Sequence, residues 1–405
     1  MTLRGGAYWR PFSLLTSYFF LLPFLLRFAF LLAVSSAALL ARPPQLTAPA
    51  ALLDQLRAKF EALHEAGSFP GGTASFDFAG GRRLGIAVGV SDRTTGRRMT
   101  PQDRMLAGSV GKTFASALAL LLVHDGRFAL DDPISRFFGS EPWFDRLPNA
   151  RRITVRQLMN HTSGLVRYEL DPKFLADLSA NPDRVWTGEQ RLAYLFDAQP
   201  PFAAGQGWEY SDTNYIVLGM IIERAGNAPY YDQLRERILY PHSLSRTIPS
   251  DSRLLPIVQG YAGAGNPVGG ADEMLAGGRF VINPQFEWTG GGLATTSDDL
   301  AKWAKLLYEG RVLPAPVMGD LLTGVPARLG PETSYGLGVM IRRTEFGVAY
   351  GHSGVMPGYQ ADVMYFPELK LAIAVQVNAS AAGATGRPLR EFIVEFARIV
   401  AAAAG

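Results

Sequence analysis

Ser109 and Lys112 are the residues of this sequence whose types and spacing point most directly to chemistry. They lie in AGSVGKTFASALALLLV, residues 107–123, which reads as a loop that continues into a buried helix. Residues three positions apart share one face of a helix, so the serine hydroxyl and the lysine amine can meet. A desolvated lysine can remove the proton of a serine and make it a nucleophile. The helix N-terminus would also point free N–H groups toward a developing oxyanion.

Three other interpretations of this segment remain open. It can be an ordinary buried helix, capped by its serine, whose lysine reaches out to water. Residues 111–113 (GKT) also match the end of a phosphate-binding loop, G-x-x-x-x-G-K-[ST], but Leu106 stands at its first Gly and polar residues 100–104 replace the strand before it. In a nucleophile elbow, G-x-S-x-G, Ala107 would replace the first Gly, and the same strand is missing.

The composition describes a globular chain and excludes several classes of site. Of its 405 residues, 48% are hydrophobic and 19% charged, and 39 basic residues nearly balance 36 acidic ones. No basic run with interleaved aromatic residues indicates a nucleic-acid surface, so we expect no nucleic-acid partner. The chain has no Cys, which excludes disulfides and thiolate metal sites. Its five scattered His form no H-E-x-x-H motif, and we expect no metal site.

Residues 1–42 have the composition of a targeting segment. Arg4 and Arg10 precede a long apolar stretch, residues 12–41, which ends in small residues. This pattern is typical of a secretory signal peptide. The stretch is also long enough to span a bilayer as an uncleaved anchor, which would attach the protein to the membrane. In both cases we expect the body of the protein to be exported, to the periplasm or the cell exterior.

Strand-like runs at both ends of the chain enclose a mostly helical middle. The expected strands are TASFDF and LGIAVGV near the start, and SYGLGVMIRR, FGVAYGH, YQADVMYF and LKLAIAVQVN near the end. The expected helices are residues 46–67, ITVRQLMNH, residues 189–197, TNYIVLGMIIERAG, SDDLAKWAKLLYEG and residues 389–403. Hairpin-length links between the later strands predict an antiparallel sheet.

These elements predict an α+β fold in which terminal helices cover one antiparallel sheet and a mostly helical lobe is inserted into it. We expect one domain over residues 43–405, with a sheet lobe of residues 43–100 plus 332–405 and a helical lobe of residues 101–331. The cleft between the lobes is the default position for an active site. The glycine-rich residues 250–292 are expected to form loops over that cleft.

Two further motifs carry side chains that could take part in catalysis. Tyr210-Ser211-Asp212 lies just before the expected helix TNYIVLGMIIERAG, and His352-Ser353-Gly354 ends an expected strand. Each motif alone has a structural explanation, because a Tyr is usually a packed aromatic and a His at a strand end is usually structural.

The three motifs together are more informative than each alone. Their order, S-x-x-K, then Y-x-D, then H-x-G, resembles that of the serine β-lactamase and penicillin-binding superfamily. The resemblance is closest to class C β-lactamases, soluble D-alanyl-D-alanine carboxypeptidases and their esterase relatives. It extends from about residue 50 to residue 400. The stretches LMNHTSGL, YSDTNY, GGGLATTSDDLAKW and GHSGVMPGY also look like this family.

The resemblance implies a role for each residue of these motifs. Ser109 would be the nucleophile that forms an acyl-enzyme, and Lys112 and Tyr210 would share the work of the general base. His352 would lie beside them on an edge strand. The backbone N–H groups of Ser109 and Val355 would form the oxyanion hole, where each donor is typically worth about 3–4 kcal/mol. No cofactor is implied.

The chain departs from the family's pattern at two positions. Asp212 stands where the family usually has Asn, and an ionised carboxylate can accept a hydrogen bond but cannot donate one. We expect Asp212 to face Lys112 or Asn214, since a carboxylate at the Tyr210 phenol would oppose its ionisation. Val355 lacks the hydroxyl that relatives binding a substrate carboxylate often have there. Asp212, Ser353 and Gly354 are the expected substrate-binding residues.

The function expected from this resemblance is that of an exported serine hydrolase acting on a small ester, a peptide or a β-lactam. Carboxypeptidase and esterase activity are the leading forms, and β-lactamase activity ranks third. An amide is harder to cleave than an ester because its leaving group must receive a proton. Of the possible activities, ester hydrolysis should therefore be the least affected by Asp212 and Val355. The alternative is a non-catalytic penicillin-binding-like module that binds cell-wall peptide or a protein partner. The sequence does not predict an oligomeric state.

Overall fold

The computed structural model describes residues 50–264, 266, 268 and 270–404. The expected signal peptide or membrane anchor, residues 1–42, lies outside these ranges. Within the described ranges, no helix is both long enough and apolar enough to cross a membrane.

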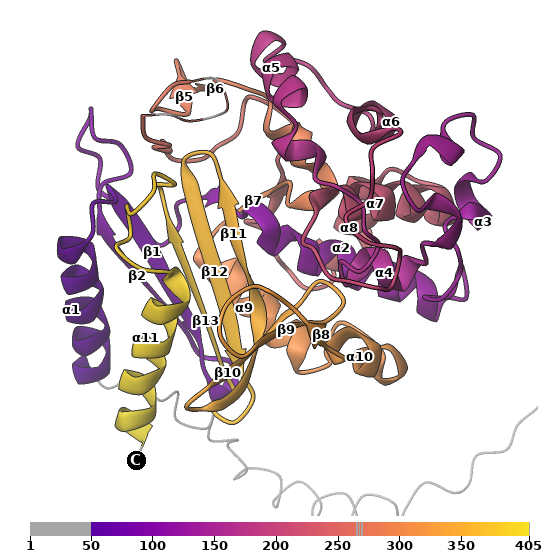
Figure 1. Ribbon diagram of the computed structural model, residues 1–405. Coiled ribbons are helices and arrows are strands. Elements are labelled where there is room, and N and C mark those ends of the chain that lie inside the picture. The colour runs from indigo at the N-terminus through magenta and orange to yellow at the C-terminus, as the bar shows by residue number, and fades with distance from the viewer. Residues whose placement is uncertain (1–49, 265, 267, 269, 405) are drawn as a thin grey trace, which may run out of the picture. The chain divides into compact units, whose positions relative to one another are not determined.

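An antiparallel sheet forms one layer of the described part of the chain (Figure 1). Its eight strands lie in the order β2-β1-β13-β12-β11-β10-β9-β8. They are β1 (Gly71–Asp77), β2 (Arg83–Gly89), β8 (Val325–Pro326), β9 (Thr333–Tyr335), β10 (Met340–Thr344), β11 (Gly347–Met356), β12 (Tyr359–Phe366) and β13 (Leu371–Val377). β1 pairs with β13, so the two ends of the chain share one sheet, as the sequence predicted.

The expected strand SYGLGVMIRR is in fact two strands, β9 and β10, that pair antiparallel with each other. Gly338, with φ of +80°, donates its backbone N–H to the Gly336 carbonyl and turns the chain between them. Glycine adopts this left-handed conformation at little cost. The prediction of one continuous strand was therefore wrong.

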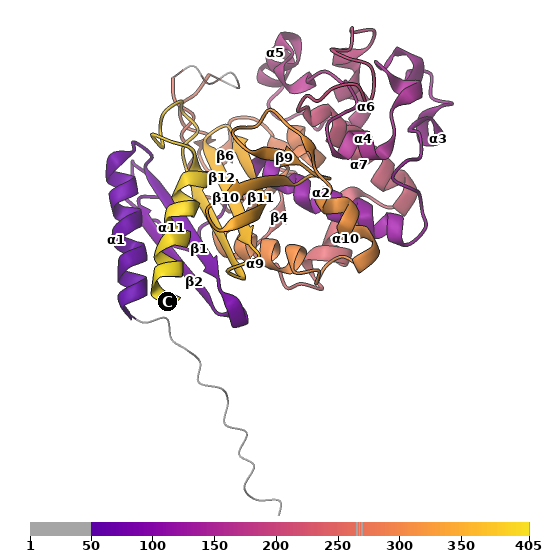
Figure 2. The same ribbon diagram turned by 60° about the horizontal axis from the view of Figure 1, so that its bottom comes forward.

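Helices cover both faces of the sheet. α1 (Ala50–Ala66) and α11 (Leu389–Ala404) lie side by side on one face (Figures 1 and 2), where Phe60 meets Phe396 edge to face. α9 (Ser297–Tyr308) packs on β1, β12 and β13. Every residue of β13 is buried, as expected for a strand covered on both faces. α9 belongs to the layered sheet region, although it lies within residues 101–331.

The helical region is built around α2 (Gly111–His124), which packs against α7 (Asp212–Gly226). All residues of α2 from 111 to 120 are buried, as expected for a helix that is largely apolar around its circumference. The remaining α-helices are α3 (Ser135–Phe138), α4 (Val155–Met159), α5 (Pro172–Ala180), α6 (Gly188–Leu192), α8 (Tyr230–Leu234) and α10 (Ala315–Leu322). The expected helix at 189–197 is α6 followed by a short 3-10 turn.

A small sheet supports the start of α2. It consists of β3 (Met105–Leu106), β7 (Leu293–Thr295) and β4 (Ile248–Pro249), and β5 (Leu275–Ala276) pairs with β6 (Arg279–Phe280) in a separate hairpin. A short strand thus precedes Ser109, contrary to the sequence interpretation. Because β3 pairs antiparallel with β7, it does not supply the parallel strand that a phosphate-binding loop requires.

Candidate active site

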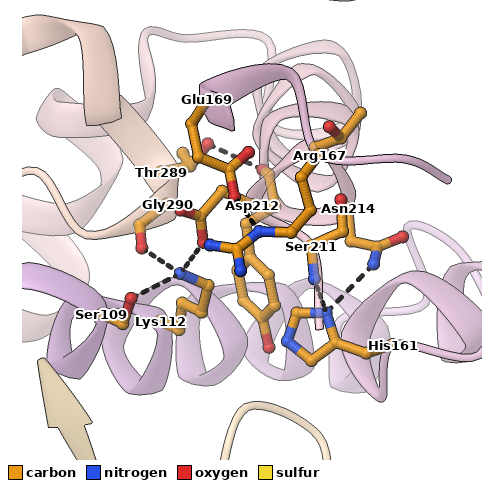
Figure 3. Close-up of polar contacts among 12 residues, drawn as sticks. Ser109, Lys112, His161, Arg167, Glu169, Ser211, Asp212, Asn214, Thr289 and Gly290 are labelled. Carbon is orange, nitrogen blue, oxygen red and sulfur yellow. Dashed lines mark hydrogen bonds and ion pairs between the residues drawn. The ribbon is translucent and has the colours of Figure 1, made fainter. Parts of the chain in front are cut away.

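Ser109 lies in a 3-10 turn, Gly108–Val110, that leads directly into α2. Lys112 lies in the first turn of the helix, and its Nζ is 3.0 Å from Ser109 Oγ (Figure 3). The spacing of three residues therefore brings the two side chains together as predicted. Lys112 is completely buried, whereas Ser109 is partly exposed. A substrate can therefore reach the serine but not the lysine.

Lys112 is surrounded by oxygen atoms. Besides Ser109 Oγ, its Nζ contacts the Gly290 carbonyl at 2.5 Å and forms an ion pair with Asp212. A lysine ammonium has three N–H groups, which match these three oxygens. Burial lowers the pKa of Lys112, but Asp212, with Tyr210 and Glu287, raises it above the ordinary lysine value. Lys112 is therefore a cation that donates to Ser109.

Asp212 begins α7 and is buried. Its carboxylate faces Lys112, which is one of the two orientations expected from the sequence. The other candidate partner, Asn214, instead contacts His161 and Ser163. The Asn-to-Asp departure thus gives the buried lysine a counter-charge.

Tyr210 lies next to the lysine, with Lys112 Nζ 4.9 Å from the centroid of its ring. The Tyr210 hydroxyl is buried and makes no hydrogen bond of ordinary geometry with a described residue, although Lys112 and Ser109 lie close enough to lower its pKa. Burial raises the pKa of Tyr210, Lys112 partly offsets this, and Asp212 raises it again, so the phenol is neutral. Lys112 and Tyr210 are thus both protonated in this structure, and a base for Ser109 requires a proton to move first.

His352 lies where β11 becomes a local edge. β10 pairs with β11 as far as Gly351, and from His352 to Met356 β11 pairs with β12 alone. His352 Nε2 is 2.9 Å from the Tyr335 hydroxyl, and the ring centroids of His352 and Tyr210 are 6.2 Å apart. Burial and the Lys112 charge lower the pKa of His352 to about 3. His352 is therefore a neutral neighbour of Tyr210.

His161 was not assigned a role from the sequence, although the stretch LMNHTSGL contains it. The Ser211 N–H lies 3.3 Å from its Nδ1, which must accept because a backbone N–H only donates. A neutral His161 therefore carries its proton on Nε2, 3.2 Å from the Tyr335 hydroxyl. Burial, followed by Lys112, lowers its pKa well below the ordinary value. Tyr335 then donates to His352 Nε2.

Two glycines allow the serine turn to approach β11 closely. A Cβ on Gly354 would lie 1.9 Å from the Ala107 carbonyl oxygen, and a Cβ on Gly108 would lie 2.6 Å from the Val355 nitrogen. Any side chain at either position would separate the two segments. The glycines thereby bring the backbones of Ser109 and Val355 to one place, as an oxyanion hole requires.

Ser353 holds a buried ion pair on the sheet side of the site. Its Oγ donates to Asp362 at 2.6 Å and accepts from Arg342 at 2.6 Å, and the Arg342 guanidinium also contacts Asp362 at 2.8 Å. A hydroxyl has one proton, so Ser353 cannot also donate to a substrate in this arrangement.

A cavity of about 660 Å³ opens at Ser109. The residues of its lining that the sequence had singled out are Ser109, Tyr210, Asp212, Ser353, Gly354 and Val355. Lys112 and His352 do not line it. The sequence analysis did not anticipate Arg167, Glu169 and Glu287, which also line it. Figure 3 shows Arg167, Glu169 and Asp212 gathered near Lys112.

A family model described as Beta-lactamase matches residues 56–398. The chain belongs to the beta-lactamase family. It is 24% identical over 320 residues to penicillin-binding protein 4* of Bacillus subtilis, covering 75% of this chain and 67% of the relative. It is 26% identical over 321 residues to a D-aminopeptidase of Brucella anthropi, covering 76% of this chain but only 56% of that relative.

Solved structures confirm the fold of this family member. The D-amino acid amidase of Ochrobactrum anthropi SV3, complexed with L-phenylalanine amide, superimposes with a TM-score of 0.75 at 25% identity, covering 88% of this chain and all of that one. A D-stereospecific amidohydrolase from Streptomyces sp. gives a TM-score of 0.70 at 28% identity, covering 81% and 94%. The chain is thus a serine hydrolase of the β-lactamase and penicillin-binding family.

Proposed function

We propose that this protein hydrolyses small amides and esters through an acyl-enzyme formed on Ser109. The observation that carries the proposal is the 3.0 Å contact between Lys112 Nζ and Ser109 Oγ at the floor of an open cavity. Ser109 Oγ attacks the substrate carbonyl, the bond to the amine or alcohol breaks, and water then cleaves the acyl-enzyme. The backbone N–H groups of Ser109 and Val355 hold the oxyanion.

The ion pair with Asp212 defines how the first proton moves. Lys112 becomes a base only after it loses one of its three protons, and the adjacent Asp212 carboxylate can accept that proton. The neutral amine then takes the proton of Ser109, and Tyr210 passes a proton on to the leaving group. The phenol is suited to this last step because it is neutral and its hydroxyl lies near both Lys112 and Ser109, which lower its pKa.

The cavity does not favour a substrate with a free carboxylate, as a D-alanyl-D-alanine carboxypeptidase would require. Val355 has no hydroxyl, and the proton of Ser353 is used by Asp362. Arg342 is paired with Asp362, and Arg167 with Glu169, so the cation of the cavity lining without an ion pair to a described residue is Arg328, which is exposed. The similarity to a D-aminopeptidase and to D-amino acid amidases supports amides as substrates alongside esters.

The test compares the full chain with its Ser109→Ala variant on p-nitrophenyl acetate, D- and L-phenylalaninamide, nitrocefin and a D-Ala-D-Ala peptide. We expect turnover of an ester or amide and a covalent adduct on Ser109 by mass spectrometry, both lost in the variant. Ser179→Ala, an exposed serine on α5, is the matched control and should keep full activity. Absence of turnover and of any adduct in the wild-type protein would instead support the non-catalytic binding module.

A further inference from the structure

Acidic side chains form one wall of the cavity beside the nucleophile. Asp212, Glu169 and Glu287 all line it. Lys112 Nζ contacts both Ser109 Oγ and the Asp212 carboxylate. A single ammonium group therefore bridges the attacking oxygen and the nearest carboxylate of this wall. No group of three or more ligating side chains in the described ranges is arranged to hold a metal ion.

Two carboxylate oxygens in this wall lack a partner. Glu169 is 8% exposed and Glu287 is 7% exposed, and the Oε2 atom of each is buried with no hydrogen bond to any described residue. A Cβ on Gly290 would lie 2.8 Å from Glu287 Oε2 and 3.6 Å from Asp212 Cβ, so both side chains lie beside Gly290. An unsatisfied buried oxygen is costly, which points to a donor supplied from outside the chain.

The balance of charge around these oxygens would favour the binding of one more cation. Beside the cavity, three carboxylates face two cations, Lys112 and Arg167. Arg191 also interacts with Glu287, but its guanidinium donates to the carbonyls of residues 186, 285 and 286 and does not line the cavity. Burial, together with Asp212, raises the pKa of Glu287 to about 8 and that of Glu169 to about 7. The cluster therefore retains a proton near neutral pH that an incoming cation can replace. On the cavity rim, the exposed Glu209 and Arg328 carry opposite charges.

We propose that Glu169, Glu287 and Asp212 form a subsite for the primary ammonium group of the substrate, next to the carbonyl that Ser109 attacks. The substrate is then an α-amino acyl amide or ester whose amine is free. An ammonium group brings three N–H donors and a positive charge, which suit the unpartnered carboxylate oxygens. This subsite rests on the proposed function, which it narrows to one class of acyl group.

Binding to the Ser109→Ala full chain tests the subsite independently of turnover. Isothermal titration calorimetry would compare phenylalaninamide with N-acetylphenylalaninamide, which has the same carbonyl but no ammonium. We expect the free amine to bind at least about tenfold more tightly, as a hydrogen bond to a charged group implies. Equal binding of the two ligands would overturn the subsite. If the preference is found but the wild-type protein turns over nothing, only the proposed function fails.

Substitutions then locate the preference. Glu169→Gln and Glu287→Gln, each combined with Ser109→Ala, should weaken binding of the free amine about tenfold and leave the acetylated ligand unchanged. Glu345→Gln is the matched control, since Glu345 is exposed and pairs with Arg398 away from the cavity. Circular dichroism checks that each variant is folded. Equal weakening of both ligands, or a preference that survives both substitutions, would place the recognition of the amine elsewhere.

Discussion

Two buried polar clusters contact the Tyr210 ring, and they differ in whether their polar atoms are satisfied. The neutral cluster consists of His161, Tyr335 and His352. The charged cluster consists of Lys112, Arg167, Glu169, Asp212 and Glu287. In the neutral cluster each of these side chains is hydrogen-bonded to the next. In the charged cluster, carboxylate oxygens remain without a partner among the described residues.

This difference separates positioning from function. A fully satisfied buried network specifies one arrangement of its side chains, so the neutral cluster can hold the Tyr210 ring in place. Buried charged groups whose oxygens lack partners are instead candidates for the exchange of protons or ligands. We therefore assign proton transfer and amine binding to the charged cluster, and packing of the tyrosine to the neutral cluster.

The largest loss of activity is expected when Lys112 is removed from the charged cluster. Lys112→Met should lower kcat about 10³-fold or more, because it removes the group that takes the proton of Ser109. It also leaves Asp212 buried without its counter-ion. Lys305→Met is the matched control, since Lys305 is a buried lysine on α9 that pairs with Glu309. The control should lose stability but not kcat. Equal loss of kcat in both variants would contradict the assignment.

Breaking the neutral cluster should affect stability more than chemistry. Tyr335→Phe leaves a ring nitrogen of His161 and one of His352 without a partner, so the free energy of unfolding should fall by about 2–4 kcal/mol. Urea denaturation measures this loss. Tyr308→Phe is the control, because the Tyr308 hydroxyl is buried without a hydrogen bond to any described group and its removal should cost little. A kcat loss as large as that of Lys112→Met would show that the neutral cluster also transfers protons.

From the sequence we assigned roles to Lys112 and Asp212 of the charged cluster and to His352 of the neutral cluster. Ser109 and Lys112 could be paired because their contact depends only on helical spacing. Tyr210 and His352 required the resemblance to a family, since 101 or more residues separate them from Ser109. Glu169 and Glu287 were missed because Glu287 lies in an irregular 3-10 segment, Pro284–Gly290, whose path no periodicity reveals.

The same limit applies to the fold. β-branched and aromatic runs predicted the long strands β11, β12 and β13, because their packing suits a buried sheet. β3 was missed because it has two residues and its pairing with β7 depends on contacts distant in sequence. His161 illustrates the same point within the site, since its backbone φ of +62° and its partners follow from tertiary packing.

The Asp212→Asn variant tests the role of the charged cluster through the pH dependence of kcat/KM. Asp212 raises the pKa of Lys112, so a neutral amide at this position lowers that pKa and increases the neutral fraction of the lysine at any given pH. The acidic limb of the kcat/KM profile should therefore move to lower pH. Asp299→Asn is the control, because Asp299 is a buried carboxylate bound to Thr247 outside the cavity. A profile that stays in place or moves to higher pH would exclude Lys112 as the base.

The smallest effect is expected at Ser353, whose hydroxyl faces an ion pair that both Asp362 oxygens already complete. Arg342 contacts Asp362 Oδ1 at 2.8 Å and Oδ2 at 3.2 Å. Ser353→Ala should therefore lower the free energy of unfolding by about 1 kcal/mol and leave KM for amides and esters unchanged. Chemical denaturation and steady-state kinetics measure the two quantities on one preparation. A rise in KM at unchanged stability would mean that the hydroxyl turns from Asp362 toward the substrate, and that the sheet side of the cavity also selects it.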